Sequence, residues 1–327
     1  MKRIFGVVLV GCGYIGEEHL ADIYYRDNIR LVAVVDLDAE RAKLTAKKYG
    51  ALEYGTDYRP FLERSDVDIV IIATYVDSHL PIMRDCVQAG KHVLCEKPVA
   101  TCRKDGENFF RIAQQAESHV LVWHILRYNA AYQKVKELID GGSIGTLRFV
   151  HIVQNHHAID WKRYCRLLKD CPPVVDCGVH YLDVMQWMSG QKITKVQGSS
   201  FLLDQDAPRK NYNIVNVELS GGCMGNYESG WSRNLHYYNS KEFIGDKGYI
   251  KLTLQADRFY DKEEGNLIEI YHSDTGVYEQ VNVPGKYKNM YAQLQELINR
   301  IEGHPESDFG LEDAKEAFFA AITAAEE

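Results

Sequence analysis

Three features that mark specialised proteins are missing from this chain of 327 residues. None of its 8 cysteines forms a C-x-x-C pair, so the usual zinc and redox spacings are absent. No apolar run approaches the roughly 18 residues that a membrane helix needs. Basic residues are not in excess, since 38 Lys and Arg stand against 46 Asp and Glu, a net charge of −8. The chain is therefore a poor candidate for a metal protein, a membrane protein or a nucleic-acid binder.

The expected compartment is the cytoplasm. Cysteines scattered through a chain of this length are typical of free, partly buried thiols in a reducing environment. The apolar start resembles a secretion signal, but Gly11 interrupts it and Glu17 and Glu18 follow without a small-residue cleavage site. We expect no signal peptide, no metal and no membrane or nucleic-acid partner.

The first third of the chain alternates short apolar runs with segments of helical periodicity. At about 150 residues per domain, the length predicts about two domains. Buried parallel strands have continuous apolar sequences, and helices between them indicate βαβ units. A Rossmann-type, doubly wound parallel sheet is predicted for residues 1–123, with strands at 5–10, 31–35, 69–73, 92–95 and 120–123.

After residue 123 the pattern changes. Apolar runs follow one another with turn signals between them and fewer helices. We predict a second domain, residues 124–327, of the α+β class with a large, mostly antiparallel sheet, for which the predicted strands are 147–153, 196–203, 214–219, 249–254, 267–271 and 277–283. The whole chain is thus an α/β protein with an added α+β domain.

A glycine-rich segment directly follows the first strand and opens a helix. Residues 11–16 read GCGYIG, which fits G-x-G-x-x-G in the context that the pattern requires. Gly11 permits the tight turn, Gly13 lets the backbone approach a pyrophosphate, and Gly16 lets the helix pack on the strand. Tyr14 and Ile15 complete the helix start, where free N–H groups bind phosphates. The segment predicts a dinucleotide site.

An acidic residue at the end of the second strand indicates which dinucleotide is bound. Asp36 lies twenty residues after Gly16, where a carboxylate accepts hydrogen bonds from the adenosine ribose. It would repel the additional phosphate of NADP, so NAD is favoured. Arg41 and Lys43 leave NADP as the alternative.

Two further segments carry candidate catalytic residues. Lys97 follows the C-terminal end of the strand at 92–95, where parallel sheets bind ligands, and Pro98 after it suggests a cis bond. The alternative is a surface lysine. A helix is expected to begin near Gly178, with Asp176 just before it and His180 in its first turn, so that both side chains could face one cleft. The alternative makes Asp176 a helix cap and His180 a capping or core histidine.

Taken together, these motifs resemble the glucose–fructose oxidoreductase / inositol dehydrogenase (Gfo/Idh/MocA) family over nearly the whole chain. Residues 73–79 (ATYVDSH) are similar to its A-T-P-x-x-x-H loop, and 89–98 (AGKHVLCEKP) to its E-K-P segment. Residues 138–145 (LIDGGSIG) and 176–183 (DCGVHYLD) match two later motifs. Tyr75 departs from the family's proline.

The resemblance implies NAD(P)-dependent oxidation and reduction of sugars, inositols or related polyols. Lys97, Asp176 and His180 would form the catalytic triad, with His180 as the base and Lys97 stabilising charge on the substrate oxygen. It also implies that Glu96 and Lys97 lie near the nicotinamide end, and that Thr74 and His79 line the cofactor crevice. A homodimer or homotetramer formed through the sheet of the second domain is expected.

The substrate is less well indicated than the reaction. Residues 169–175 replace a segment that is glycine-rich in many members, and this segment borders the expected substrate position. Arg127, His157 and Tyr238 are our candidate substrate contacts, because sugars are bound by aromatic faces and hydrogen-bonding groups. Two alternatives to the dehydrogenase remain: a glycoside-cleaving enzyme that oxidises its substrate transiently, and a non-catalytic dinucleotide-binding regulator.

Overall fold

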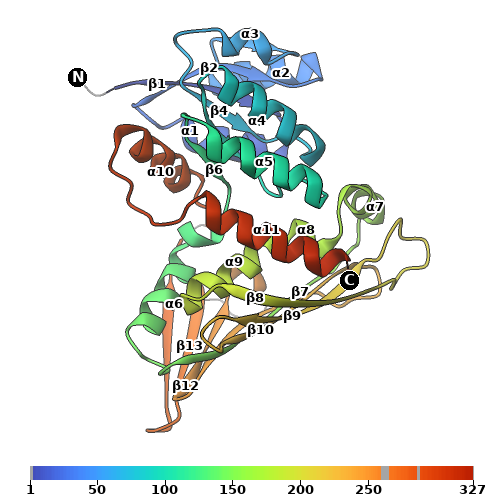
Figure 1. The fold of residues 1–327 in the computed structure, drawn as a ribbon, viewed down its shortest axis with the longest axis vertical. Helices are drawn as coiled ribbons and strands as arrows, with labels where there is room; N and C mark the ends of the chain where they lie inside the picture. The colour runs from blue at the N-terminus through green and yellow to red at the C-terminus, as the bar shows by residue number, and fades with distance from the viewer. Residues whose placement is uncertain (1–2, 259–264, 286–287, 327) are drawn as a thin grey trace. The chain divides into compact units, whose positions relative to one another are not determined.

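The chain forms two compact units in the computed structural model, which describes residues 3–258, 265–285 and 288–326 (Figure 1). The first unit comprises the chain as far as Trp123 together with residues 289–315. The second comprises residues 124–288 together with the C-terminal segment that starts at Glu316. The first unit thus also contains a late segment that the sequence places with the second domain.

The first unit is built on a parallel sheet, which confirms the predicted Rossmann class. Its strand order is β3-β2-β1-β4-β5-β6, and every residue of β1 and β4 is buried, as their unbroken apolar sequences require. The strands are β1 (Phe5–Val10), β2 (Ile29–Val35), β3 (Glu53–Gly55), β4 (Ile69–Ile72), β5 (His92–Cys95) and β6 (Val120–Val122). The helices are α1 (Tyr14–Ile23), α2 (Ala39–Tyr49), α3 (Arg59–Leu62), η1 (Val76–Ser78), α4 (His79–Gln88), α5 (Arg103–Gln115) and α10 (Met290–Glu302).

The strand order reverses between β1 and β4. In sheets of this kind the ligand crevice opens at that point, beyond the carboxyl ends of the strands. Backbone hydrogen bonds align these ends along one edge: the amide of Gly11 donates to Val35, that of Ala73 to Val10 and that of Glu96 to Ile72, over 2.8–3.0 Å. The loops that carry the predicted cofactor residues therefore start side by side.

Helix α10 joins the first unit through specific contacts. The side-chain amide of Gln293 donates a hydrogen bond to the carbonyl of Val122, 2.9 Å away. The guanidinium of Arg26 lies 4.2 Å from the centre of the Tyr291 ring and donates to the backbone carbonyl of the same residue. These contacts, which join residues far apart in the sequence, explain why the late segment packs with the first unit.

The second unit is dominated by an eight-stranded sheet in the order β14-β13-β12-β11-β7-β10-β9-β8. It is mostly antiparallel, as predicted, with β7 and β10 as a parallel pair. The strands are β7 (Leu147–His157), β8 (Ile193–Phe201), β9 (Tyr212–Leu219), β10 (Met224–Ser232), β11 (Tyr238–Gly245), β12 (Gly248–Thr253), β13 (Asn266–His272) and β14 (Val277–Val283). The helical segments are η2 (Ile125–Tyr128), α6 (Ala130–Asp140), α7 (Trp161–Asp170), α8 (Pro173–Asp176), α9 (Gly178–Ser189), η3 (Gln255–Asp257) and α11 (Leu311–Glu326), the last of which begins in the first unit.

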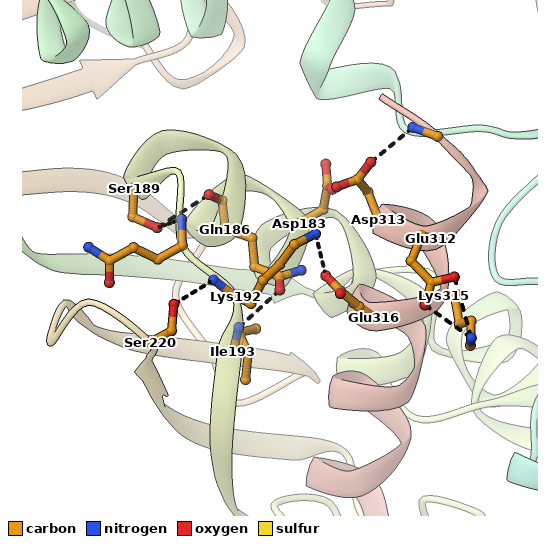
Figure 2. Close-up of polar contacts among 12 residues, drawn as sticks. Asp183, Gln186, Ser189, Lys192, Ile193, Ser220, Glu312, Asp313, Lys315 and Glu316 are labelled. Atoms are coloured by element: carbon orange, nitrogen blue, oxygen red, sulfur yellow. Dashed lines mark hydrogen bonds and ion pairs between the residues drawn. The ribbon is translucent and has the colours of Figure 1, made fainter. Parts of the chain in front are cut away.

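Within the second unit, the turn between α9 and β8 is held by polar contacts (Figure 2). The amide of Ile193 donates to the side-chain oxygen of Gln186, and the amide of Lys192 to the hydroxyl of Ser220. The ammonium of Lys192 lies 2.7 Å from a carboxylate oxygen of Glu316. This exposed ion pair links the turn to α11, although pairs of this kind contribute only about 0–1 kcal/mol.

A lysine is fully buried in the middle of the large sheet. Lys241 of β11 is paired with Ile152 on β7 and Leu252 on β12, and its ammonium lies 3.2 Å from the carboxylate of Asp257. Tyr237 and Asn239 also donate hydrogen bonds to that carboxylate. Burial lowers the pKa of Lys241 to about 8, against the opposing effect of Asp257.

Replacing Lys241 with Met is expected to lower the free energy of unfolding by about 3 kcal/mol, because it leaves a buried carboxylate without its counter-ion. Lys195→Met is the matched control, since Lys195 pairs with Glu218 at the surface and should contribute only about 0–1 kcal/mol. Urea unfolding measures both. Equal effects of the two substitutions would contradict the assigned role of Lys241.

The difference in the free energy of unfolding between the wild type and the Lys241→Met variant should also depend on pH. Because the folded-state pKa of Lys241 lies below that of the unfolded chain, the unfolded state binds this proton more tightly. The stability of the wild type relative to the Lys241→Met variant should therefore rise from about pH 8 to about pH 10.

Candidate functional site

The glycine loop between β1 and α1 is shaped by close backbone packing. Gly11 has a φ of +100°, a conformation that side chains other than glycine rarely adopt. A Cβ atom on Gly11 would lie 2.4 Å from the carbonyl oxygen of Ala73, and one on Gly16 would lie 2.0 Å from that of Gly11. The absence of side chains at these two positions is thus required by the fold itself.

Gly13 differs from its two neighbours, because no protein atom lies within 4 Å of the position that its Cβ would take. Gly13 is the residue before α1, and no side chain caps the helix there. Helix starts carry free N–H groups and a partial positive charge, which bind anions. The open space at Gly13 therefore fits the close approach of a pyrophosphate, and the loop suits a dinucleotide.

The carboxylate of Asp36 follows β2 and is oriented by two backbone amides. One oxygen accepts a hydrogen bond from Cys12 and the other from Asp38, each over 2.9 Å. Arg41 is half exposed, and its guanidinium lies 3.5 Å from the same carboxylate. Each oxygen retains acceptor capacity, as binding of ribose hydroxyls requires.

The cysteine of the glycine loop, Cys12, has an unreactive thiol. Cys12 is buried, and burial together with the nearby Asp36 raises the pKa of its thiol to about 12. All eight cysteines of the chain are free thiols, which agrees with the expectation from the sequence. Cys12 therefore contributes its backbone to the site rather than its sulfur.

Thr74 and His79 lie in the segment after β4. His79 is buried, with one ring nitrogen 2.9 Å from the carbonyl oxygen of Pro98 and the other 3.1 Å from that of Thr74. Burial lowers the pKa of His79. These contacts make His79 a link between two loops of the crevice edge, and a direct cofactor contact by Thr74 or His79 remains a prediction.

Glu96 and Lys97 follow β5, and the bond between Lys97 and Pro98 is cis, as suspected from the sequence. Glu96 is buried, and one of its oxygens lies 2.9 Å from Nε2 of His19. Its other oxygen accepts a hydrogen bond from the amide of Lys97, over 3.3 Å. The Lys97 side chain is half-buried.

Sequence reasoning missed His19. The signal was present, since His19 shares the buried face of α1 with Gly16, Leu20 and Ile23. A histidine on such a face needs a polar partner.

Asp176 and His180 lie within the second unit, on either side of the start of α9. Asp176 ends α8, and His180 is in the first turn of α9, which begins at Gly178 as predicted. Both side chains are half-buried. The rings of His180 and His124 meet edge to face, with centres 5.8 Å apart. A catalytic role for Asp176 and His180 remains a prediction.

Arg127 makes a bidentate ion pair with Asp183, through contacts of 2.8 and 2.7 Å. Burial opposes the ionisation of Asp183, yet His124 and Arg127 outweigh that effect and hold its pKa well below the usual range. Arg127 also lies over the Trp187 ring. The guanidinium thus has an internal role in the second unit, and a substrate contact by Arg127 remains a prediction.

His157 and Tyr238 are exposed at the ends of β7 and β11. Their neighbours His156 and Tyr237 lie instead in an aromatic cluster, where the His156 ring is nearly parallel to those of Trp231 and Tyr237 at 6.3 and 6.4 Å. Successive residues of a strand point to opposite faces, so a shift of one residue changes the environment completely. Substrate contacts by His157 and Tyr238 remain predictions.

The cluster around His156 also has hydrogen-bonding and electrostatic partners. The hydroxyl of Tyr164 lies 3.2 Å from Nδ1 of His156. Burial lowers the pKa of His156, while the carboxylates of Asp176 and Asp257 act in the opposite direction. His156 therefore belongs to the electrostatic surroundings of Asp176. Period-two alternation from the buried Val150 and Ile152 would have pointed to it.

The described part of the chain lacks two kinds of feature. No three His, Cys, Asp or Glu side chains there are grouped so as to hold a metal ion. No helix among the described residues has the length and apolar character to span a membrane.

Two family models match consecutive parts of the chain. Residues 5–124 match the model of an oxidoreductase family with an NAD-binding Rossmann fold, GFO_IDH_MocA. Residues 132–251 match the model of the GFO/IDH/MocA C-terminal domain.

Individual proteins show the same likeness. The inositol 2-dehydrogenase of Burkholderia ambifaria (strain MC40-6) is 28% identical over 260 residues, covering 75% of this chain and 72% of the relative. The aldose–aldose oxidoreductase of Caulobacter crescentus superposes with a TM-score of 0.83 at 21% identity, covering 99% of this chain and 98% of that one. The apo scyllo-inositol dehydrogenase of Lactobacillus casei superposes with a TM-score of 0.78 at 19% identity, covering 100% of this chain and 96% of that one. At these identities the two structures show the fold alone.

The contrast between Gly11 and Gly13 can be tested directly. Gly11→Ala is expected to destabilise the protein by about 3 kcal/mol, because of strain at a positive φ and a clash with Ala73. Gly13→Ala should cost about 1 kcal/mol or less but weaken binding of NAD at least tenfold, since the methyl group enters the open space. Thermal unfolding and calorimetric titration with NAD separate the two effects. Unchanged affinity in a folded Gly13→Ala variant would contradict this placement of the pyrophosphate.

Proposed function

Since this chain belongs to the GFO/IDH/MocA oxidoreductase family, we propose that it is an NAD-dependent dehydrogenase of polyols. It transfers a hydride between the nicotinamide and a secondary hydroxyl or ketone of a sugar, an inositol or a related compound. The observation that carries this proposal is the presence of Lys97, Asp176 and His180 at the motif positions, in a chain with open space at Gly13, just before α1.

The seat for the dinucleotide is formed by the chain's own backbone and one carboxylate. The start of α1 binds the pyrophosphate at Gly13, and Asp36 accepts hydrogen bonds from the ribose. Asp36 is also the basis for proposing NAD rather than NADP, since a further phosphate would meet its negative charge. When bound, the nicotinamide accepts or returns the hydride.

Proton transfer is assigned to His180. Oxidation of an alcohol requires loss of the hydroxyl proton as the hydride leaves carbon, and histidine exchanges protons near neutral pH. His180 lies in the first turn of α9 and is half-buried. Its edge-to-face contact with His124 fixes one side of the ring.

Lys97 and Asp176 are assigned supporting roles at the reacting group. The ammonium of Lys97 donates a hydrogen bond to the substrate oxygen and stabilises the negative charge that develops there. Asp176 orients His180 or accepts a hydrogen bond from a neighbouring hydroxyl. Sugars and polyols pack against aromatic rings, and the cluster of His156, Tyr164, Trp231 and Tyr237 supplies such rings.

The substrate class is proposed from the relatives. An inositol 2-dehydrogenase matches three quarters of the chain, and an aldose–aldose oxidoreductase shares its fold. Inositols and aldoses are therefore the first compounds to test, with formation of reduced nicotinamide as the readout. Release of an aglycone from a glycoside without net reduced nicotinamide would favour the glycoside-cleaving alternative.

Lys97→Met and His180→Asn are each expected to lower kcat by about 10²–10⁴-fold while the affinity for NAD changes little. The reason is that both side chains act on the substrate oxygen and its proton, and neither belongs to the pyrophosphate or ribose seat. Steady-state kinetics and calorimetric titration with NAD give the two quantities.

Exposed residues of the same types serve as controls for this pair. Lys104→Met and His304→Asn alter side chains at the surface of the first unit and should leave kcat within about twofold. Near-normal turnover in folded Lys97→Met and His180→Asn variants would overturn the assigned roles.

Asp36→Ala is expected to raise KM for NAD about tenfold and to lower the preference for NAD over NADP. The variant loses hydrogen bonds to the ribose and removes the charge that opposes a second phosphate. Arg41, next to Asp36, then remains as a partner for that phosphate. The ratio of kcat/KM for the two cofactors is the measurement.

Asp38→Ala is the matched control for this prediction. Asp38 caps α2 by accepting hydrogen bonds from the amides of Glu40 and Arg41. Its loss should cost about 1 kcal/mol of stability without changing the cofactor ratio. A cofactor ratio in Asp36→Ala equal to that of the wild type would show that Asp36 does not select NAD.

A further inference from the structure

A buried imidazole–carboxylate contact lies behind the candidate lysine of the first unit. Nε2 of His19, on α1, is 2.9 Å from Oε1 of Glu96, which follows β5. The side chains are only 2% and 10% exposed. Buried polar groups of this kind are costly unless they are hydrogen-bonded, so each of these groups depends on the other.

The ring of His19 is held from a second side. Trp123 packs against it edge to face, with ring centres 4.7 Å apart and an interplanar angle of 73°. Packing of this type restricts the ring without competing for its nitrogen. His19 therefore presents Nε2 to Glu96 from a fixed position on α1.

Glu96 transmits that position to the next residue. Its backbone amide donates to Ile72 over 3.0 Å, which ties the backbone to the sheet. Its Oε2 accepts the amide hydrogen of Lys97 over 3.3 Å. A continuous series of hydrogen bonds thus runs from α1, which directly follows Gly13, through Glu96 to the backbone of Lys97.

We propose that His19 is a positioning residue, which orients Lys97 through Glu96. The inference rests on the proposed function, because it takes Lys97 to be the group that contacts the substrate oxygen. As a consequence, α1 has two roles: its start binds the dinucleotide, and His19 on it orients Lys97. Loss of the His19–Glu96 bond leaves the Glu96 carboxylate free to turn away from the Lys97 amide, and the ammonium is then held less well.

The test uses the full chain and three single variants. His19→Phe keeps a ring against Trp123 but removes the donor, so kcat is expected to fall about 10- to 100-fold with less than a threefold change in NAD affinity. His19→Gln restores a donor and should recover most of kcat. Trp123→Leu removes the ring packing but not the hydrogen bond, and should lower kcat less than His19→Phe does.

A double-mutant cycle with Lys97→Met separates positioning from a general structural effect. If His19 acts through Lys97, His19→Phe should have little further effect on the residual activity of Lys97→Met, so the two losses are not additive. Additive losses, a normal kcat in His19→Phe, or a failure of His19→Gln to recover activity would each overturn the inference.

A second readout needs no substrate. With the protein labelled by ¹⁵N-lysine and saturated with NAD, the Lys97 amide signal is identified by its absence in Lys97→Arg. That signal should move in His19→Phe and return toward its original position in His19→Gln, and an unmoved signal contradicts the inference. If the Lys97 signal responds as expected but Lys97→Met retains turnover, the role assigned to Lys97 fails while the contact itself stands.

Discussion

The close approach of β1 and β4 at their carboxyl ends is the constraint on which the dinucleotide seat depends. At Gly11 there is no room for a side chain, because the backbone of Ala73 occupies that space. This packing turns the chain sharply into α1 and leaves Gly13 with open space in front of it. The amide of Cys12 then orients Asp36 on the neighbouring strand end. One steric requirement thus sets the loop, the helix start and the acidic residue together.

Charge is arranged differently in the two units. In the first, the buried polar pair of His19 and Glu96 lies directly behind Lys97. In the second, Asp183 binds Arg127 and His124, and His124 contacts the ring of His180. Lys97 and His180 thus each adjoin a hydrogen-bonded or ion-paired group that their own unit supplies. Such support restricts side-chain motion, which catalysis by positioning requires.

The sequence predicted best what depends on local pattern. The strands of the first unit were clear because buried parallel strands are continuously apolar, and the glycine loop was clear because its spacing has a mechanical cause. The strands β10 and β11 were missed, although they flank β7 at the centre of the large sheet. Their sequences, MGNYESGWS and YNSKEFIG, contain glycines and polar residues such as Lys241, whose burial depends on the distant Asp257.

Within the candidate site, the same limit applies. Asp36, Lys97 and His180 were found because each occupies a motif position next to a predictable element. The role of His19 required knowledge that α1 packs beside the end of β5, and the pairing of Arg127 with Asp183 joins residues 56 positions apart. Tertiary contacts of this kind leave little trace in a single sequence.

The central claim is hydride transfer between a polyol carbon and the nicotinamide. Its most direct test is to incubate the protein with NAD and inositols or aldoses that carry deuterium on their ring carbons, and to analyse the reduced cofactor by mass spectrometry. We expect reduced nicotinamide that carries one deuterium taken from the substrate. Bound NAD that is never reduced, or reduced nicotinamide without deuterium, would contradict it.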